Sequence, residues 1–184
     1  MNTFIAILRG INVSGKRIIK MDALKQLFTD LNFKNIQTYI QSGNVIFKSS
    51  DSDVLEIKKR IENGILNAFS LEVPVIIITS DELESVVSEN PFTEDETKNS
   101  NFLHVTFLSE KPKEEYVIQL NGMNFPEEEF QIKNNAIYLY CPNGYGNSKL
   151  TNTFFEKKLK TTATTRNWKT TKELLNIAAK IANS

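Results

Sequence analysis

IQTYIQSGNVIF, residues 36–47, decides the fold that we expect for this chain. Two runs rich in β-branched and aromatic residues, 36–40 and 45–47, flank a short polar segment. Within that segment, Gly43 and Asn44 supply the backbone freedom that a tight turn requires. The stretch therefore predicts a β-hairpin with antiparallel strands, and the sheet built on it is expected to be antiparallel.

The residues around this hairpin predict one complete structural unit. An apolar run at 3–8 is typical of a buried strand, and apolar residues at helical spacing predict helices at 21–31 and 54–69. A further strand is expected at 73–79. The resulting order, strand, helix, two strands, helix, strand, is that of a ferredoxin-like motif.

The same order recurs in the second half of the chain. The elements expected there are a strand at 102–108, a helix at 112–120, strands at 129–132 and 136–140, a helix at 150–159 and an extended piece at 161–164. A capping box at 170–173 predicts the start of a final helix. The prediction is thus an α+β fold with two tandem ferredoxin-like (βαββαβ) subdomains, antiparallel sheets and an extra C-terminal helix. Its parts are 1–79, a connecting helix and linker at 80–100, and 101–184.

Charge and cysteine content restrict the possible partners and the cellular location only slightly. Twenty-two basic and 22 acidic residues give zero formal charge, so attraction to nucleic acid needs a local basic patch. Cys141 is the single cysteine, which excludes an internal disulfide and predicts a reducing, cytoplasmic location. The apolar run at the N-terminus is too short to span a bilayer, so no membrane partner is expected.

The segment 10–16 fits the phosphate-binding pattern G-x-x-x-x-G-K, but two features argue against a P-loop. Arg17 stands where the magnesium-binding Ser or Thr belongs, and the sheet is expected to be antiparallel. Nevertheless, the loop suits an anion, because Arg9, Lys16, Arg17 and Lys20 occur together with two glycines. Asn12 in the same loop is also counted among the candidate ligand-binding residues. The alternative is a solvated loop whose glycines only turn the chain.

Two further groups of polar residues complete the candidate site. Around the hairpin turn, Tyr39, Ser42 and Asn44 are able to contact a base or a small polar ligand, or belong to an ordinary edge hairpin. Lys149 and Arg166 come shortly before expected helix starts, where anions are favoured. Trp168 offers a stacking surface or packs in the core. Together with the loop residues, these groups are predicted to form one basic cleft.

Neither a catalytic residue nor a cofactor follows from the sequence. His104 is the single histidine and has no nearby nucleophile or acidic partner in the sequence, so we expect a structural role. Cys141 is expected to be a buried thiol, and no zinc or calcium spacing occurs. The catalytic residues and the cofactor, if the protein uses them, stay unknown at this stage.

Four segments carry a resemblance to a known family. They are LRGINVSGK (8–16), TYIQSGNVIF (38–47), YGNSKL (145–150) and ATTRNW (163–168). They resemble the signature segments of the bacterial family called domain of unknown function 1697, in the same order and over essentially the whole chain. The resemblance implies a bacterial cytosolic α+β protein with ferredoxin-like subdomains, and it implies no activity.

Three hypotheses about function remain open. The first is a binding module for phosphate-bearing ligands, either nucleotide or nucleic acid, at the basic cleft. The second is an enzyme that acts on a small anionic metabolite. The third is a structural or regulatory module that forms a homodimer or another protein complex through its sheet edges.

Overall fold

The computed structural model describes residues 1–183, and the chain folds as two compact units. The first unit contains residues 1–85 and the residues from 173 onward, and the second contains residues 86–172. The sequence-based division placed the whole last helix in the second half, whereas the structure groups most of that helix with the first unit.

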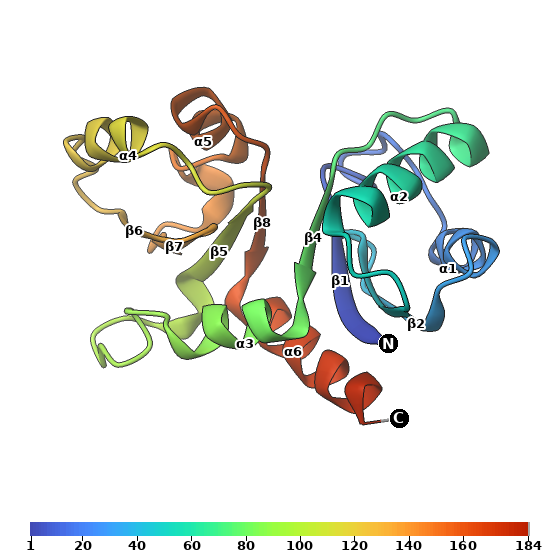
Figure 1. The fold of residues 1–184 in the computed structure, drawn as a ribbon. Coiled ribbons are helices and arrows are strands. Elements are labelled where there is room, and N and C mark those ends of the chain that lie inside the picture. The colour runs from blue at the N-terminus through green and yellow to red at the C-terminus, as the bar shows by residue number, and fades with distance from the viewer. Residues whose placement is uncertain (184) are drawn as a thin grey trace. The chain divides into compact units, whose positions relative to one another are not determined.

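The first unit is built on one four-stranded antiparallel sheet with the strand order β2-β3-β1-β4. Its elements are β1 (Asn2–Leu8), α1 (Met21–Asp30), β2 (Lys34–Tyr39), β3 (Asn44–Ser49), α2 (Val54–Phe69) and β4 (Val75–Thr79). The predicted hairpin at 36–47 is confirmed as β2 and β3, and the sheet order is consistent with a ferredoxin-like arrangement. Helices α1 and α2 cover one face of this sheet (Figure 1).

The core of the first unit lies between the sheet and these two helices. Helix α2 turns Ile57, Ile61 and Ile65 inward, because residues four apart share one helical face. Three phenylalanines form the centre of this core: the ring centroid of Phe47 lies 5.2 Å from that of Phe28 and 4.4 Å from that of Phe33. The resulting core is dense enough to hold the strand ends, and the loops that leave them, in defined positions.

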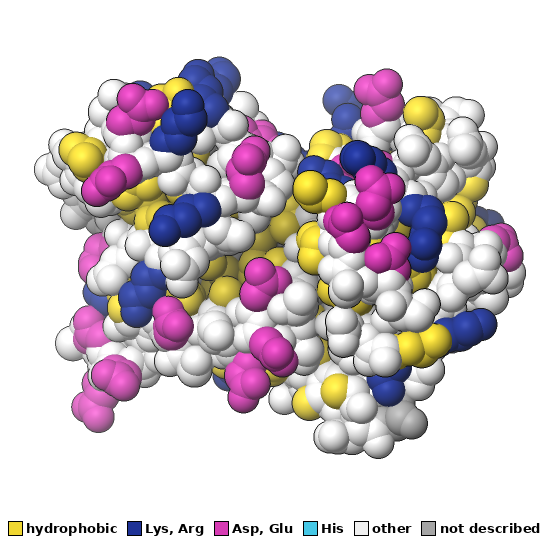
Figure 2. All heavy atoms as spheres, viewed as in Figure 1, with side chains coloured by type: hydrophobic (Ala, Val, Ile, Leu, Met, Phe, Trp, Pro, Cys, Tyr) yellow, Lys and Arg dark blue, Asp and Glu magenta, His cyan; other side chains and the backbone are white. Residues whose placement is uncertain are grey.

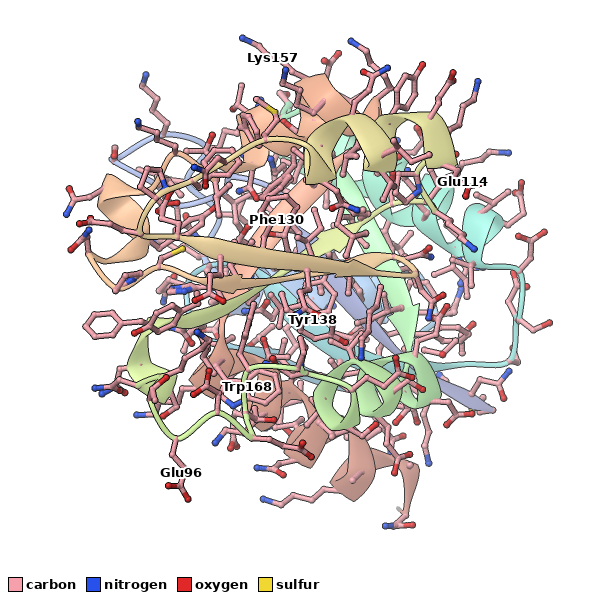
Figure 3. All side chains as sticks on the ribbon, turned by 90° about the vertical axis from the view of Figure 1, so that its left-hand side faces the viewer. Glu96, Glu114, Phe130, Tyr138, Lys157 and Trp168 are labelled. Atoms are coloured by element: carbon pink, nitrogen blue, oxygen red, sulfur yellow. The ribbon has the colours of Figure 1, made fainter. Side chains whose placement is uncertain are left out.

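The second unit repeats the same order around a sheet with the strand order β6-β7-β5-β8. Its elements are β5 (Leu103–Leu108), α4 (Glu114–Asn121), β6 (Glu129–Lys133), β7 (Ala136–Tyr140), α5 (Asn152–Leu159) and β8 (Ala163–Asn167), with short 3-10 helices at Ser100–Phe102 and Tyr145–Asn147. Figure 3 shows that Phe130 points toward α4 and α5, whereas Tyr138 lies on the other face of the sheet. The α+β fold class is therefore confirmed in both units.

Two further helices, α3 (Ser80–Ser88) and α6 (Trp168–Ala182), complete the chain, and the start of α6 corrects a prediction. The expected capping box at 170–173 lies inside α6. The side chain of Asn167 caps this helix instead, because its Oδ1 accepts a hydrogen bond of 2.7 Å from the Thr170 N–H. Strand β8 also runs to 167 rather than 164, since the β-branched Thr164 and Thr165 pair with β5.

The surface carries both signs of charge in close proximity. On the face shown in Figure 2, basic and acidic side chains are interspersed over α2 rather than segregated. Within residues 1–183, no helix combines the length and the apolar character that crossing a bilayer requires.

Candidate functional site

Residues 9–20, which we call the basic loop, connect β1 to α1 and form a small hairpin of their own. The Lys16 N–H donates to the carbonyl of Val13 over 2.9 Å, and both central residues of this turn have positive φ, 50° at Ser14 and 73° at Gly15. These angles define a type I′ turn. Helix α1 starts only at Met21, so the structure agrees with the sequence-based argument against a P-loop.

Asn12 holds the basic loop in place through its side-chain amide. Its Nδ2 donates to the carbonyls of Ile19 and Gln41, and its Oδ1 accepts from the Ile19 N–H, each over 2.9 Å. The bond to Gln41 joins the basic loop to the turn between β2 and β3. The structure therefore brings together the first two groups of candidate residues, and Asn12 serves as an anchor within the protein.

Close packing beneath the basic loop adds to this anchor. Ile11 is buried, and its side chain lies against Gly43 in the hairpin turn. A Cβ atom added to Gly43 would lie only 2.6 Å from Ile11 Cδ1, which is far inside van der Waals contact. Gly43 also has a φ of 79°, so both the space and the backbone angle require glycine at this position.

The cations of the basic loop differ in their surroundings. Arg9 is half-buried, whereas Lys16, Arg17 and Lys20 are exposed. Arg17 lines a hollow of about 340 Å³ together with Glu62, Asn63, Leu66, Glu72, Val73 and Pro74. Because two carboxylates line the same hollow, Arg17 is less suited to an incoming phosphate than the two exposed lysines.

The hairpin residues Tyr39, Ser42 and Asn44 form an internal hydrogen-bond network. Asn44 is fully buried, and its Nδ2 donates to the Tyr39 carbonyl over 3.0 Å and to Ser42 Oγ over 3.1 Å. The Asn44 side chain therefore shapes the turn from within. The Tyr39 and Ser42 side chains are half-buried at its surface.

In the second unit, Lys149 also stands beside carboxylates. It lines a hollow of about 320 Å³ with Phe125, Pro126, Glu127, Glu128, Asn143 and Asn147. The Lys149 N–H donates to Glu128 Oε2 over 3.2 Å, and Asn143 Nδ2 donates to Glu127 Oε2. The sequence predicted a cationic environment at Lys149, and the structure shows one of mixed charge.

Arg166 and Trp168 are both buried, with 8% and 5% of their surface exposed. Arg166 lies on β8, and its Nη1 donates to Thr164 Oγ1 over 3.1 Å and to the Thr165 carbonyl over 2.9 Å. Trp168 is the first residue of α6. Seven candidate residues thus belong to the first unit and Lys149, Arg166 and Trp168 to the second, and their convergence on one cleft stays a prediction.

Sequence reasoning overlooked a polar cluster around His104 in the second unit. The His104 ring stacks on Tyr145 with centroids 5.0 Å apart, and the Tyr145 hydroxyl donates to Thr165 Oγ1 over 3.0 Å. Thr165 in turn donates to Asn152 Oδ1 over 2.6 Å. Tyr145 and Thr165 belong to two of the four signature segments, and this membership was the signal available in the sequence.

Burial governs the titration of the ionisable groups near this cluster. It raises the pKa of the Cys141 thiol to about 11, so Cys141 stays protonated and unreactive at neutral pH. It also lowers the pKa of His104, whose Nδ1 lies 3.2 Å from the Phe102 carbonyl. Within residues 1–183, no three His, Cys, Asp or Glu side chains are grouped to hold a metal ion.

The lowered pKa of His104 predicts a pH dependence of stability. The folded protein takes up this proton less readily than the unfolded chain, so the free energy of unfolding is expected to fall as the pH drops through about 6.5. His104→Phe keeps the ring stacking on Tyr145 and removes the titration. In urea unfolding at about pH 7.5 and about pH 5.5, it is expected to lose less stability than the wild type. An equal loss in both proteins would contradict this account.

The structure is similar to that of a conserved bacterial protein, SP0830, from Streptococcus pneumoniae, with a TM-score of 0.77 and 21% sequence identity over 97% of this chain and 99% of that chain. At this identity the likeness shows the fold alone. A comparison with curated proteins finds no match. The model of the family described as "Protein of unknown function (DUF1697)" matches residues 1–138, and the chain therefore belongs to that family.

Proposed function

We propose that this protein binds phosphate-bearing ligands, either nucleotide or nucleic acid, through the basic loop. The observation that carries the proposal is the charge of this loop: Arg9, Lys16, Arg17 and Lys20 fall within twelve residues that contain no carboxylate. Charge-assisted hydrogen bonds from lysine and arginine are the usual means of holding phosphate oxygens.

The fixed shape of the loop supports the same proposal. Asn12 and Ile11 hold the loop against the hairpin turn, so the backbone that carries its cations needs little reorganisation when a ligand binds. Among residues 1–183, the backbone N–H groups of Ser14 and Gly15 in the turn of the basic loop have no hydrogen-bond acceptor. They add two donors next to Lys16.

The contribution of Lys149, Arg166 and Trp168 to a shared cleft stays part of the proposal. A cytoplasmic location is also a proposal, and it rests on the single cysteine, Cys141.

Binding to a single-stranded polyanion tests the proposal. Fluorescein-labelled oligodeoxythymidylate is titrated with the full chain, and anisotropy is followed over a series of salt concentrations. Each phosphate contact is expected to contribute about −0.7 to the slope of log affinity against log salt. The double variant Lys16→Gln/Lys20→Gln is therefore expected to flatten the slope by about 1.4.

A matched control separates the basic loop from general surface charge. Lys157→Gln/Lys158→Gln removes two exposed cations from the last turn of α5 and is expected to bind like the wild type. The proposal fails if the wild type does not bind at low salt, or if the two double variants weaken binding equally.

A further inference from the structure

Three aliphatic side chains are exposed on the two segments that Asn12 joins. Val13 is 57% exposed, Ile18 is 67% exposed and Ile40 is 47% exposed. Val13 begins the turn of the basic loop, and Ile40 precedes Gln41, whose carbonyl accepts the bond from Asn12. Exposed aliphatic side chains of this size on two segments that a hydrogen bond joins indicate a surface that meets another apolar phase.

The charges next to these side chains restrict what that phase is. The basic loop carries four cations and no carboxylate, and the turn segment 37–44 carries no charged side chain. We call the basic loop together with residue 40 the tip. A protein or lipid surface that complements the charge of the tip is anionic. Apolar side chains flanked by lysine and arginine are the arrangement by which peripheral proteins bind membranes that contain anionic lipid.

Binding to a nucleic acid accounts for the cations of the basic loop but not for its exposed apolar side chains. Single strands are held by aromatic side chains on which the bases stack, whereas the exposed apolar groups of this tip are aliphatic. Nucleic-acid binding alone therefore leaves these aliphatic side chains without a role.

We propose that the tip formed by the basic loop and residue 40 docks on the surface of a bilayer that contains anionic phospholipid. Lys16 and Lys20 pair with lipid phosphates, and Val13, Ile18 and Ile40 enter the boundary between headgroups and acyl chains. This inference rests on the proposed phosphate binding by the basic loop and adds lipid phosphate as a further ligand of the same cations. It replaces the expectation of no membrane partner, which came from the lack of a spanning segment, because surface docking needs no span.

Sedimentation with vesicles tests this docking directly. The full chain is mixed with vesicles of phosphatidylcholine alone or of phosphatidylcholine with phosphatidylglycerol. Binding is expected only with the anionic lipid. Ile18→Ser is expected to weaken it about tenfold, because an isoleucine no longer enters the apolar boundary. Lys16→Gln/Lys20→Gln is expected to weaken it about thirtyfold.

The control for the apolar contact is Ile118→Ser on α4, since Ile118 is 64% exposed and lies in the second unit. It is expected to sediment like the wild type. Docking is overturned if phosphatidylglycerol makes no difference, or if Ile118→Ser loses as much binding as Ile18→Ser.

The oligodeoxythymidylate assay distinguishes this inference from the function on which it rests. Ile18→Ser is expected to bind the oligonucleotide as the wild type does while it loses vesicle binding. If the wild type binds the oligonucleotide but no vesicle, docking fails and the proposed phosphate binding stands. If it binds neither, both proposals fail.

Discussion

Replacing Gly43 by alanine is expected to lower the free energy of unfolding of the first unit by about 2–5 kcal/mol, the sum of a left-handed backbone penalty and overpacking. Gly43 has a φ of 79°, and its missing Cβ leaves the space that Ile11 Cδ1 and Leu8 Cβ occupy, 2.6 and 2.9 Å from where a methyl would lie. Leu8 is fully buried in β1 and cannot move away without disturbing the sheet.

Gly15→Ala is the matched control for this prediction. Gly15 has nearly the same φ, 73°, but a Cβ added there meets nothing within 4 Å. Its substitution is expected to cost only the backbone penalty, about 1–2 kcal/mol. Two units need not unfold together, so hydrogen exchange of the β1 and β3 amides is the suitable measurement. Equal losses in the two variants would mean that packing against Ile11 contributes nothing.

Asn12→Ala is expected to destabilise the basic loop and the hairpin turn by about 2–4 kcal/mol. The substitution removes three hydrogen bonds of 2.9 Å and leaves the N–H of the buried Ile19 without its acceptor. It also places alanine at a φ of 54°. Hydrogen exchange at Ile19 is expected to speed up, and binding to oligodeoxythymidylate is expected to weaken because the backbone that carries the cations is no longer held in place.

Asn32→Ala separates these contributions, because Asn32 has a similar φ of 62° but its side chain makes no hydrogen bond within the described part of the chain. It is expected to cost about 1–2 kcal/mol and to leave oligonucleotide binding unchanged. If Asn12→Ala costs no more than Asn32→Ala, the amide of Asn12 does not anchor the loop.

Much of the fold was predictable because its signals are local. The hairpin at 36–47 follows from two β-rich runs and a Gly-Asn turn, and α2 follows from isoleucines four residues apart. The end of the chain was less predictable. Thr170–Glu173 satisfies the capping pattern, but pairing of β8 with β5 extends the strand to Asn167 and makes Asn167 the cap. A long-range pairing overrode a local preference there.

The candidate site was also predictable in part: its segments followed from the sequence, and the roles of its side chains did not. The polar segments were identified from composition, and the structure shows that the basic loop and the hairpin turn lie together. The role of each side chain was not predictable, because Asn12 and Asn44 satisfy backbone groups of the protein and Arg166 is bonded to Thr164 on its own strand. Polar residue types show that a hydrogen bond is needed, and they do not show which partner supplies it.

By itself, the sequence determined the element order, the antiparallel hairpins and the concentration of cations between residues 9 and 20, because each of these depends on neighbours along the chain. The tertiary structure alone decided that Asn12 joins this loop to the hairpin turn by a hydrogen bond and that the Ile11 side chain packs against Gly43, where a Cβ atom would collide with it. It also decided that Val13, Ile18 and Ile40 stay exposed beside the lysines. Burial and hydrogen-bond pairing depend on segments that folding brings together from positions about thirty residues apart in the sequence. Local sequence patterns do not show which distant segments will meet.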